Sequence, residues 1–362
     1  MSVLSDHAPS AVSMAPITAS SVSSHSIKSP LCSKRITIVG AFGLVGREVL
    51  GILESLGVPI ENISALGSAR SAGTRLPFGG GELSIDEVSE KAFDACDVAL
   101  FCTDAKTAHR FAPVAIARGV RVVDNSSAFR LDDSVPLVIP EINGAELGND
   151  AQLAANPNCS TIIMLMAIEP IRRAFGVSTT IVSTYQAASG AGRAALDELR
   201  SQTAAVLEDR EAQPRSFPVP CAFNVFPHES AVDSETGLNV EESKIIAEAR
   251  KILSTPRFDV APTCVRVPVE RCHSQSIVLE LDRPATLEEV AEVAHAFPGV
   301  VFHADPALLV TPRDVAGTDL VSISRARLSG DGRRLSIWVC GDQLRKGAAL
   351  NAIQIAERLV AL

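Results

Sequence analysis

From residue 34 onward, apolar stretches of strand and helix period alternate along the chain. Residues 34–57, KRITIVGAFGLVGREVLGILESLG, begin with β-branched residues, continue through closely spaced glycines and end in an apolar repeat of helical period. This order predicts a strand, a tight turn and a helix. Residues 97–105 and 119–129 are apolar runs that end in polar residues, as buried strands of a parallel sheet do. We therefore predict a doubly wound, Rossmann-like α/β domain over residues 34–157.

The second half of the chain predicts a different kind of sheet. Its strand-like stretches are residues 179–187, 261–269, 274–281 and 333–340. Residues 287–297 have helical spacing, and together these elements predict an α+β catalytic domain with a mixed sheet over residues 158–342. The closing residues, 343–362, contain an amphipathic helix that we expect to return and pack on the first domain.

Composition and charge fit a two-domain globular protein. The chain has 362 residues, of which 46% are apolar and 21% are charged, enough for two cores. No apolar run reaches the roughly 18 residues of a membrane span. The formal net charge of −9 argues against a broad surface for nucleic acid or anionic membranes, but it is compatible with small anionic substrates. We expect a soluble protein with a small-molecule substrate, no nucleic-acid partner and no membrane contact.

The cysteines and the N-terminal segment bear on the compartment. The eight cysteines are scattered, and only Cys272 has a histidine beside it, His273. This spacing predicts no metal site and no disulfide scaffold, and it favours a reducing, cytoplasmic setting. Residues 1–33 are rich in Ser, Ala and Pro with one acidic residue, Asp6, which predicts a disordered extension. The alternative is an organelle transit peptide, but the arginines typical of such peptides are missing.

A glycine-rich loop follows the first predicted strand. Gly40, Gly43 and Gly46 form GxxGxxG, in which backbone without side chains can approach a pyrophosphate at the positive end of a helix dipole. The pattern alone also fits a plain strand-to-helix turn, but its place near the start of a domain favours a dinucleotide. The predicted cofactor loop is Gly40, Ala41, Phe42, Gly43, Leu44, Val45 and Gly46.

The type of cofactor depends on residues 63–73, ISALGSARSAG, about twenty residues further on. An NAD enzyme usually offers a carboxylate to the ribose hydroxyls at this point. This segment has no carboxylate, and Ser68, Arg70 and Ser71 are suited to a 2′-phosphate. We therefore prefer NADP to NAD, while use of both stays open. The alternative is that Arg70 is a solvated loop residue.

One cysteine stands at a position that favours reaction. In AANPNCSTIIMLMAI, residues 154–168, Pro157 disfavours helix before it and Asn158 can cap the apolar helix that follows. Cys159 then lies in the first helical turn, where unpaired amides and the helix dipole should lower its pKa. The alternative is that Cys159 is a small buried hydrophobe.

Five motifs in one order give the chain a family resemblance. They are NPNCST at 156–161, STYQAASGAG at 183–192, NVEESK at 239–244, VRVPVERCHSQS at 265–276 and DQLRKGAALNAIQIA at 342–356. With them the chain, from about residue 35 to its end, resembles aspartate-β-semialdehyde dehydrogenases. The resemblance implies an NADP-binding domain and a catalytic domain whose mixed sheet forms a homodimer interface.

The resemblance also implies roles for single residues. Cys159 would attack an acyl phosphate, with the region of Asn158 helping to hold the oxyanion, and Gln186 would orient the substrate. His273 would be the general acid and base, a task that suits imidazole. Without the family, His273 reads as an ordinary strand-end histidine.

Four charged residues would hold the substrate. By resemblance, Arg266 clamps the substrate carboxylate with its planar fork, Glu241 contacts the amino group, and Lys244 and Arg130 bind phosphate. Without the family, Glu241 and Lys244 read as a solvated helical ion pair and Arg130 as a surface charge near the ligand crevice.

The positions of Arg266 and His273 raise a geometric question. They are seven residues apart, which would place them on opposite faces of one regular strand. Pro268, which lies between them, predicts a break in the strand that would let them share a site.

The implied reaction is the NADPH-dependent reductive dephosphorylation of L-aspartyl-4-phosphate to L-aspartate-4-semialdehyde through a cysteine thioacyl intermediate. It belongs to the synthesis of lysine, threonine, methionine and diaminopimelate.

Two positions depart from the family pattern: Phe42 replaces a small threonine in the glycine loop, and Gln343 replaces the asparagine that borders the nicotinamide. Three alternatives stay open, namely a related acyl-phosphate reductase, a CoA-thioester reductase and a non-catalytic paralogue.

Overall fold

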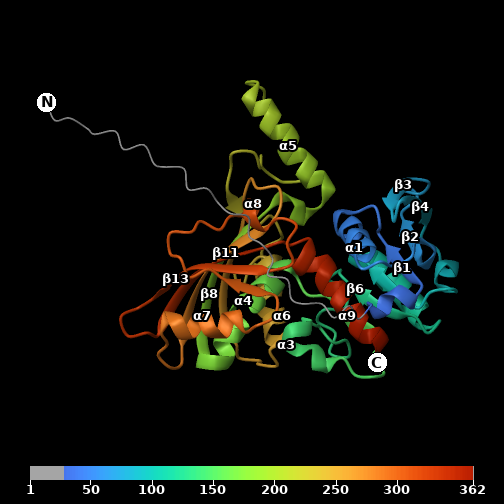
Figure 1. Cartoon of the computed structure of the whole chain (residues 1–362). Coiled ribbons are helices and arrows are strands. Elements are labelled where there is room, and N and C mark those ends of the chain that lie inside the picture. The colour runs from blue at the N-terminus through green and yellow to red at the C-terminus, as the bar shows by residue number, and fades with distance from the viewer. Residues whose placement is uncertain (1–27, 362) are drawn as a thin grey trace.

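The computed structural model describes residues 28–361, which form two seven-stranded sheets lying side by side, each with its own helices (Figure 1). Residues 1–27 of the predicted disordered extension lie outside the described residues. For residues 28–33 the prediction of disorder was wrong. Pro30–Ser33 form a 3-10 helix, and Leu31 is fully buried. The polar composition of the segment gave no sign that Leu31 packs against the C-terminal helix. Ser29 Oγ also donates to Glu357 Oε1 of that helix at 2.6 Å.

The first sheet has the strand order β3-β4-β2-β1-β5-β6-β7, and its strands from β4 to β7 pair in parallel. Its strands are β1 Ile36–Val39, β2 Ile63–Gly67, β3 Arg75–Phe78, β4 Gly81–Glu87, β5 Val98–Phe101, β6 Arg121–Asp124 and β7 Leu153–Ala155. The helices of this part of the chain are α1 Leu44–Ser55, α2 Ala105–Ile116 and α3 Pro140–Asn143, with 3-10 turns at Ile60–Asn62, Glu90–Phe93 and Gly144–Glu146. The parallel strands and crossover helices confirm the doubly wound fold that the apolar runs predict.

The second sheet is mixed, as predicted, with the order β12-β13-β14-β11-β8-β10-β9. The parallel pairs are β8 with β10 and β12 with β13. Its strands are β8 Val177–Gln186, β9 Phe226–Pro227, β10 Asp259–Arg266, β11 His273–Leu281, β12 Val300–Phe302, β13 Val321–Leu328 and β14 Arg334–Gly341. The helices of this part are α4 Cys159–Phe175, α5 Arg193–Leu207, α6 Val240–Ile252, α7 Leu287–His295 and α8 Pro312–Val315, with a 3-10 turn at Ala188–Ala191.

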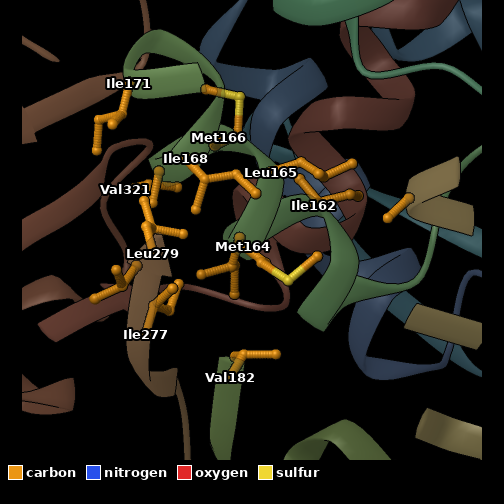
Figure 2. Close-up of a cluster of buried hydrophobic side chains, with 14 of the residues drawn as sticks. Ile162, Met164, Leu165, Met166, Ile168, Ile171, Val182, Ile277, Leu279 and Val321 are labelled. Atoms are coloured by element: carbon orange, nitrogen blue, oxygen red, sulfur yellow. The ribbon is translucent and has the colours of Figure 1, made fainter. Parts of the chain in front are cut away.

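Helix α4 is the centre of the second core. Leu165 and Ile168, like most of the helix, are fully buried and belong to one hydrophobic cluster with Val182, Ile277 and Leu279 of the sheet (Figure 2). Each such side chain contributes about 1.5–3 kcal/mol by its burial. The apolar run is therefore a core helix, and its packing holds the first turn of α4 in place.

The C-terminal helix crosses back to the first sheet. After a π-helical turn at Arg345–Ala349, helix α9 runs over Leu350–Ala361 and shares a core cluster with β1 and β5 (Figure 1). The chain therefore passes from the first sheet to the second and returns, which places the loops before α4 and α9 at the junction of the two sheets. Among residues 28–361, no helix combines the length and the hydropathy that a membrane crossing requires.

Candidate active site

A cavity of about 510 Å³ lies at the junction of the two sheets. Of the residues singled out from the sequence, the cavity lining contains Gly43, Leu44, Val45, Arg130, Asn158, Cys159, Gln186, Glu241, Lys244, Arg266 and Gln343. The others, which the lining does not contain, are Gly40, Ala41, Phe42, Gly46, Ser68, Arg70, Ser71 and His273. Of this second group, His273 nevertheless contacts the site, because it lies directly behind Cys159.

Three neighbouring strands bring Arg266, Gln186 and His273 together. Arg266 at the end of β10 pairs in register with Gln186 at the end of β8. Ser274 pairs with Tyr185 on the other side of β8, which puts His273 beside Gln186. The predicted break between Arg266 and His273 is confirmed: they belong to different strands with β8 between them.

The cysteine occupies the first position of α4. Asn158 caps this helix, as predicted, because its side-chain oxygen accepts from the backbone N–H groups of Ser160 and Thr161 at 2.9 and 3.2 Å. Cys159 Sγ lies 3.4 Å from His273 Nε2. The sulfur and the imidazole are therefore in direct contact at one wall of the cavity.

The prediction that the pKa of the Cys159 thiol is lowered was wrong. Burial, followed by the negative charge of Glu241, raises the pKa of the Cys159 thiol to about 11. Burial, followed by the positive charge of Arg266, lowers the pKa of His273 to about 3. The first helical turn alone should lower the pKa of the thiol, but loss of hydration outweighs it here. Both groups are consequently neutral near pH 7.

The ring of His273 has a fixed orientation. Its Nδ1 accepts the backbone N–H of Ala187 at 3.1 Å. With hydrogens assigned from this network, the neutral ring carries its proton on Nε2, the atom that faces Cys159. The imidazole therefore presents a hydrogen-bond donor to the sulfur and to whatever is bonded to it.

Glu241 is the hub of the polar network next to the sulfur. Its Oε1 accepts from Asn158 Nδ2 at 2.8 Å and from Gln186 Nε2 at 3.2 Å, and its Oε2 accepts from Lys244 Nζ at 3.5 Å. Burial opposes ionisation of Glu241, but His228, Lys244 and the two amides outweigh it and lower the pKa. The predicted pair of Glu241 with Lys244 on one face of α6 is present, and it is part of the site.

Arg130 is buried and not the surface charge that its position alone suggests. Its guanidinium donates to Glu248 at 3.1 Å and to the backbone carbonyls of Asn156 and Asn125 at 2.9 and 2.8 Å. Glu248 also accepts the backbone N–H of Asn158 at 2.6 Å. Glu248 is not among the residues predicted from the sequence, although it lies seven residues after Glu241 and so on the same face of α6.

Arg266 has two polar partners that are also not among the residues predicted from the sequence. Its guanidinium pairs with both carboxylate oxygens of Glu229 and contacts His228. Both partners lie in the irregular segment between β9 and α6. No periodicity marks such a segment, so the residues themselves carried no signal for these contacts.

The glycine loop fits a dinucleotide. Gly43 is the N-cap residue of α1, and no side chain caps the amides of the first turn. Leu44 and Val45 therefore bring an uncapped helix N-terminus to the cavity. A Cβ on Gly46 would lie 2.3 Å from the carbonyl oxygen of Gly40, which requires glycine there. Phe42 is 41% exposed and lies outside the cavity lining, with the Arg47 guanidinium 4.6 Å from its ring centre. The bulky ring therefore leaves the loop open.

The predicted 2′-phosphate residues lie at the same edge of the sheet. Ser68, Arg70 and Ser71 follow the C-terminal end of β2, which pairs in parallel with β1 before the glycine loop. Arg70 is exposed, and Ser71 Oγ donates to the carbonyl of Ser68 at 3.1 Å. The position is that of the ribose end of a dinucleotide in such folds.

Gln343 joins the two segments that hold His273. Its Oε1 accepts the backbone N–H of Cys272 at 2.7 Å, and its Nε2 donates to Ser189 Oγ at 2.6 Å. Cys272 has a φ of 75°, a left-handed conformation that costs free energy for a residue other than glycine. The amide of Gln343 thus fixes the strained residue next to the imidazole.

A nucleotide-binding parallel sheet that faces a cysteine and a histidine across a shared cavity defines a two-domain, nicotinamide-nucleotide-dependent oxidoreductase. Comparisons identify the family. Residues 35–150 match the family model described as semialdehyde dehydrogenase, NAD binding domain, and residues 168–346 match semialdehyde dehydrogenase, dimerisation domain. The chain belongs to the aspartate-semialdehyde dehydrogenase family.

Relatives and solved structures agree over most of the chain. The aspartate-semialdehyde dehydrogenase of Bacillus subtilis (strain 168) is 42% identical over 335 residues, covering 90% of this chain and 96% of the relative. That of Synechocystis sp. is 42% identical over 329 residues, covering 90% and 97%. The crystal structure of aspartate semialdehyde dehydrogenase II from Vibrio cholerae has a TM-score of 0.86 and 38% identity, covering 91% of this chain and 98% of that one.

Proposed function

We propose that this chain reduces L-aspartyl-4-phosphate to L-aspartate-4-semialdehyde with NADPH and releases phosphate, in the synthesis of lysine, threonine, methionine and diaminopimelate. The observation that carries the proposal is the contact of Cys159 with His273 in a cavity whose other charged residues match an acidic amino acid. A related enzyme from Vibrio cholerae was crystallised in a complex with ASA.

Cys159 is the proposed nucleophile. Its sulfur bonds to the acyl carbon of the substrate, the bond from that carbon to the phosphate oxygen breaks, and phosphate leaves with the electron pair, so that a thioester remains on Cys159. Because the thiol is neutral near pH 7, its proton must leave as the sulfur attacks, and the departing phosphate takes it up. The Nε2–H group of His273, whose ring is oriented by Ala187, donates a hydrogen bond that stabilises the charge forming on the sulfur and on the substrate oxygen.

The charged residues are proposed to orient the substrate. Arg266 binds the α-carboxylate, Glu241 binds the amino group, and Lys244 with Arg130 binds the phosphate. Gln186 positions the acyl group through its contact with Glu241. Asn158 holds the helix N-terminus at the sulfur, and its N–H and Nδ2 already donate to carboxylates, so we assign the support of the oxyanion to its region and not to these two donors.

NADP would be held by the first domain. The glycine loop, residues 40–46, would take the pyrophosphate, and Arg70 with Ser68 and Ser71 would take the 2′-phosphate, since a guanidinium and two hydroxyls there face no competing carboxylate within residues 63–73. When bound, NADPH supplies the hydride that reduces the thioester. Gln343 belongs to the same wall of the cavity.

The organisation of the chain follows from the two cores. We propose a cofactor domain over residues 34–157, completed by 343–362, and a catalytic and dimerisation domain over 158–342.

Along β8, side chains alternate between the buried face and an open face, where Ile181 is 50% exposed. An apolar side chain there, on the face opposite α4, supports a homodimer through this sheet. The eight cysteines are unpaired, which supports a cytoplasmic location.

The first experiment is the reverse reaction. Purified protein is given L-aspartate-4-semialdehyde, NADP and phosphate, and NADPH formation is followed for the wild type and for Cys159→Ala. We expect NADPH formation that requires phosphate and is lost in the variant. The same rate with coenzyme A in place of phosphate would instead indicate a thioester reductase, and a folded wild type that does not bind NADPH would indicate a non-catalytic paralogue. NAD in place of NADP tests the choice of cofactor.

A further inference from the structure

The guanidinium of Arg266 is nearly saturated by groups of this chain. Its Nε and Nη2 donate to the two oxygens of Glu229 at 3.2 and 2.7 Å. Nη2 also donates to His228 Nε2 at 2.9 Å, and Nη1 donates to the carbonyl of Ala187 at 3.0 Å. Four of the five N–H groups of the guanidinium are therefore engaged.

The occupied edge is the one that a substrate carboxylate needs. A carboxylate binds a guanidinium best through two parallel N–H groups, and Glu229 holds the edge of Arg266 formed by Nε and Nη2. On the other edge, His228 and Ala187 each take one hydrogen. A carboxylate entering the cavity thus finds one free N–H on Arg266 unless Glu229 or His228 moves away.

The ion pair of Arg266 with Glu229 compensates the charge of a buried guanidinium. Arg266 is 2% exposed, and a buried guanidinium without a counter-charge is strongly destabilising. Glu229 supplies that charge: burial opposes its ionisation, but Arg266 outweighs burial and lowers its pKa. If the carboxylate of a bound substrate took the place of the Glu229 side chain, Arg266 would keep a counter-charge and two hydrogen bonds.

The position of Glu229 allows its side chain to move away from Arg266. It lines the cavity, and its side chain is 18% exposed while that of Arg266 is 2% exposed. It belongs to the irregular segment after β9, whereas Arg266 is fixed at the end of β10. Movement of Glu229 would therefore break no helix or sheet hydrogen bonds.

We propose that Glu229 is a specificity-determining residue that competes with the α-carboxylate of the substrate for Arg266. Only a ligand that brings its own carboxylate can replace Glu229 without leaving Arg266 unpaired, so the exchange selects acidic amino-acid derivatives over acyl groups that lack this carboxylate. This inference rests on the proposed role of Arg266 as the substrate clamp.

The test measures occupancy of the site without turnover. The full chain is treated with N-ethylmaleimide at increasing L-aspartate, and labelling of the peptide containing Cys159 is followed by mass spectrometry. We expect the L-aspartate concentration that halves labelling to fall by about threefold or more in Glu229→Gln, since a neutral amide competes less well than a carboxylate for a guanidinium. The matched control is Glu235→Gln, an exposed residue of the same segment, which should equal the wild type.

An unchanged or increased concentration in Glu229→Gln overturns the inference, and so does a complete lack of protection in the wild type and in the variant. If Glu229→Gln does not fold, Glu229→Asp is used, because its shorter carboxylate cannot keep both hydrogen bonds; the same decrease is expected. The proposed function is judged separately by the phosphate-dependent reaction. A wild type without turnover whose protection still shifts in the variant rejects the function and keeps the competition.

Discussion

At the scale of single residues, the environment of Cys159 matters more than its place in the sequence. The helix N-terminus and the Asn158 cap are both present, yet burial and Glu241 raise the pKa of the thiol. An anionic side chain 82 residues away in sequence cannot be weighed from the motif NPNCST alone. The neutral pair of Cys159 and His273 also means that only a small fraction of the thiol is ionised near pH 7 before a ligand binds.

The raised pKa gives a pH prediction for Cys159. Below the pKa, the thiolate fraction increases about tenfold for each pH unit, so alkylation of Cys159 by iodoacetamide without substrate should rise throughout pH 7 to 9.5. Peptide mass spectrometry measures the rate. Glu241→Gln removes a negative charge that raises the pKa, so its curve should shift to lower pH. A plateau of the wild-type rate below pH 8 would contradict the prediction.

A second residue prediction concerns Gln343. Gln343→Leu leaves the buried N–H of Cys272 without an acceptor, which costs about 1–3 kcal/mol. Urea denaturation should show this loss of unfolding free energy, together with reduced turnover because His273 follows Cys272. Gln343→Asn is the matched control, since it retains an amide. Wild-type stability and turnover in the leucine variant would show that the bridge to Ser189 and Cys272 has no positioning role.

At the scale of elements, helix α4 connects packing to chemistry. Its first residue carries the sulfur, and the rest of the helix fills the second core. Strands β8, β10 and β11 end or begin at the same edge, so Gln186, Arg266 and His273 meet there. The strand pattern indicated that each strand exists, but the order β10-β8-β11 decided which ends are neighbours.

The core role of α4 predicts a large effect of truncation. Leu165 is fully buried, so Leu165→Ala should lower the unfolding free energy by about 2–5 kcal/mol through lost burial and the cavity left behind. Chemical denaturation followed by circular dichroism measures the change. Val206→Ala, on the exposed side of α5 where Val206 is 38% exposed, should change stability by less than about 0.5 kcal/mol. Equal effects of the two variants would contradict the core assignment.

At the scale of the whole molecule, the site exists only because two sheets meet. The glycine loop comes from one sheet, the cysteine and histidine from the other, and α9 returns across the junction (Figure 1). The open face of the second sheet lies on the side away from α4 and α7. That face is where we place the contact with a second copy.

The proposed dimer gives a prediction at this scale. Ile181→Glu puts a charge in the middle of the open face, where Ile181 is 50% exposed, and burying an unpaired charge in an interface is costly. Sedimentation velocity should show a dimer for the wild type and a monomer for the variant. Leu287→Glu, on helix α7 of the covered face, places a charge on a residue 39% exposed and should leave the dimer intact. A wild-type monomer, or a dimeric Ile181→Glu, would reject this interface.

The sequence by itself determined the main elements and the candidate residues. Apolar periods identified β1, β5, β6, β8, β10, β11, β14 and α4, the glycine spacing identified the α1 turn, and the motif set identified Cys159, His273 and Arg266, because these signals are local in the chain. Only the tertiary structure decided which groups surround them: Glu248 pairs with Arg130, and Glu229 pairs with Arg266. It also decided that the Cys159 thiol is buried. Charge pairing and loss of hydration depend on groups that are distant in sequence and adjacent in space, so no local pattern contains them.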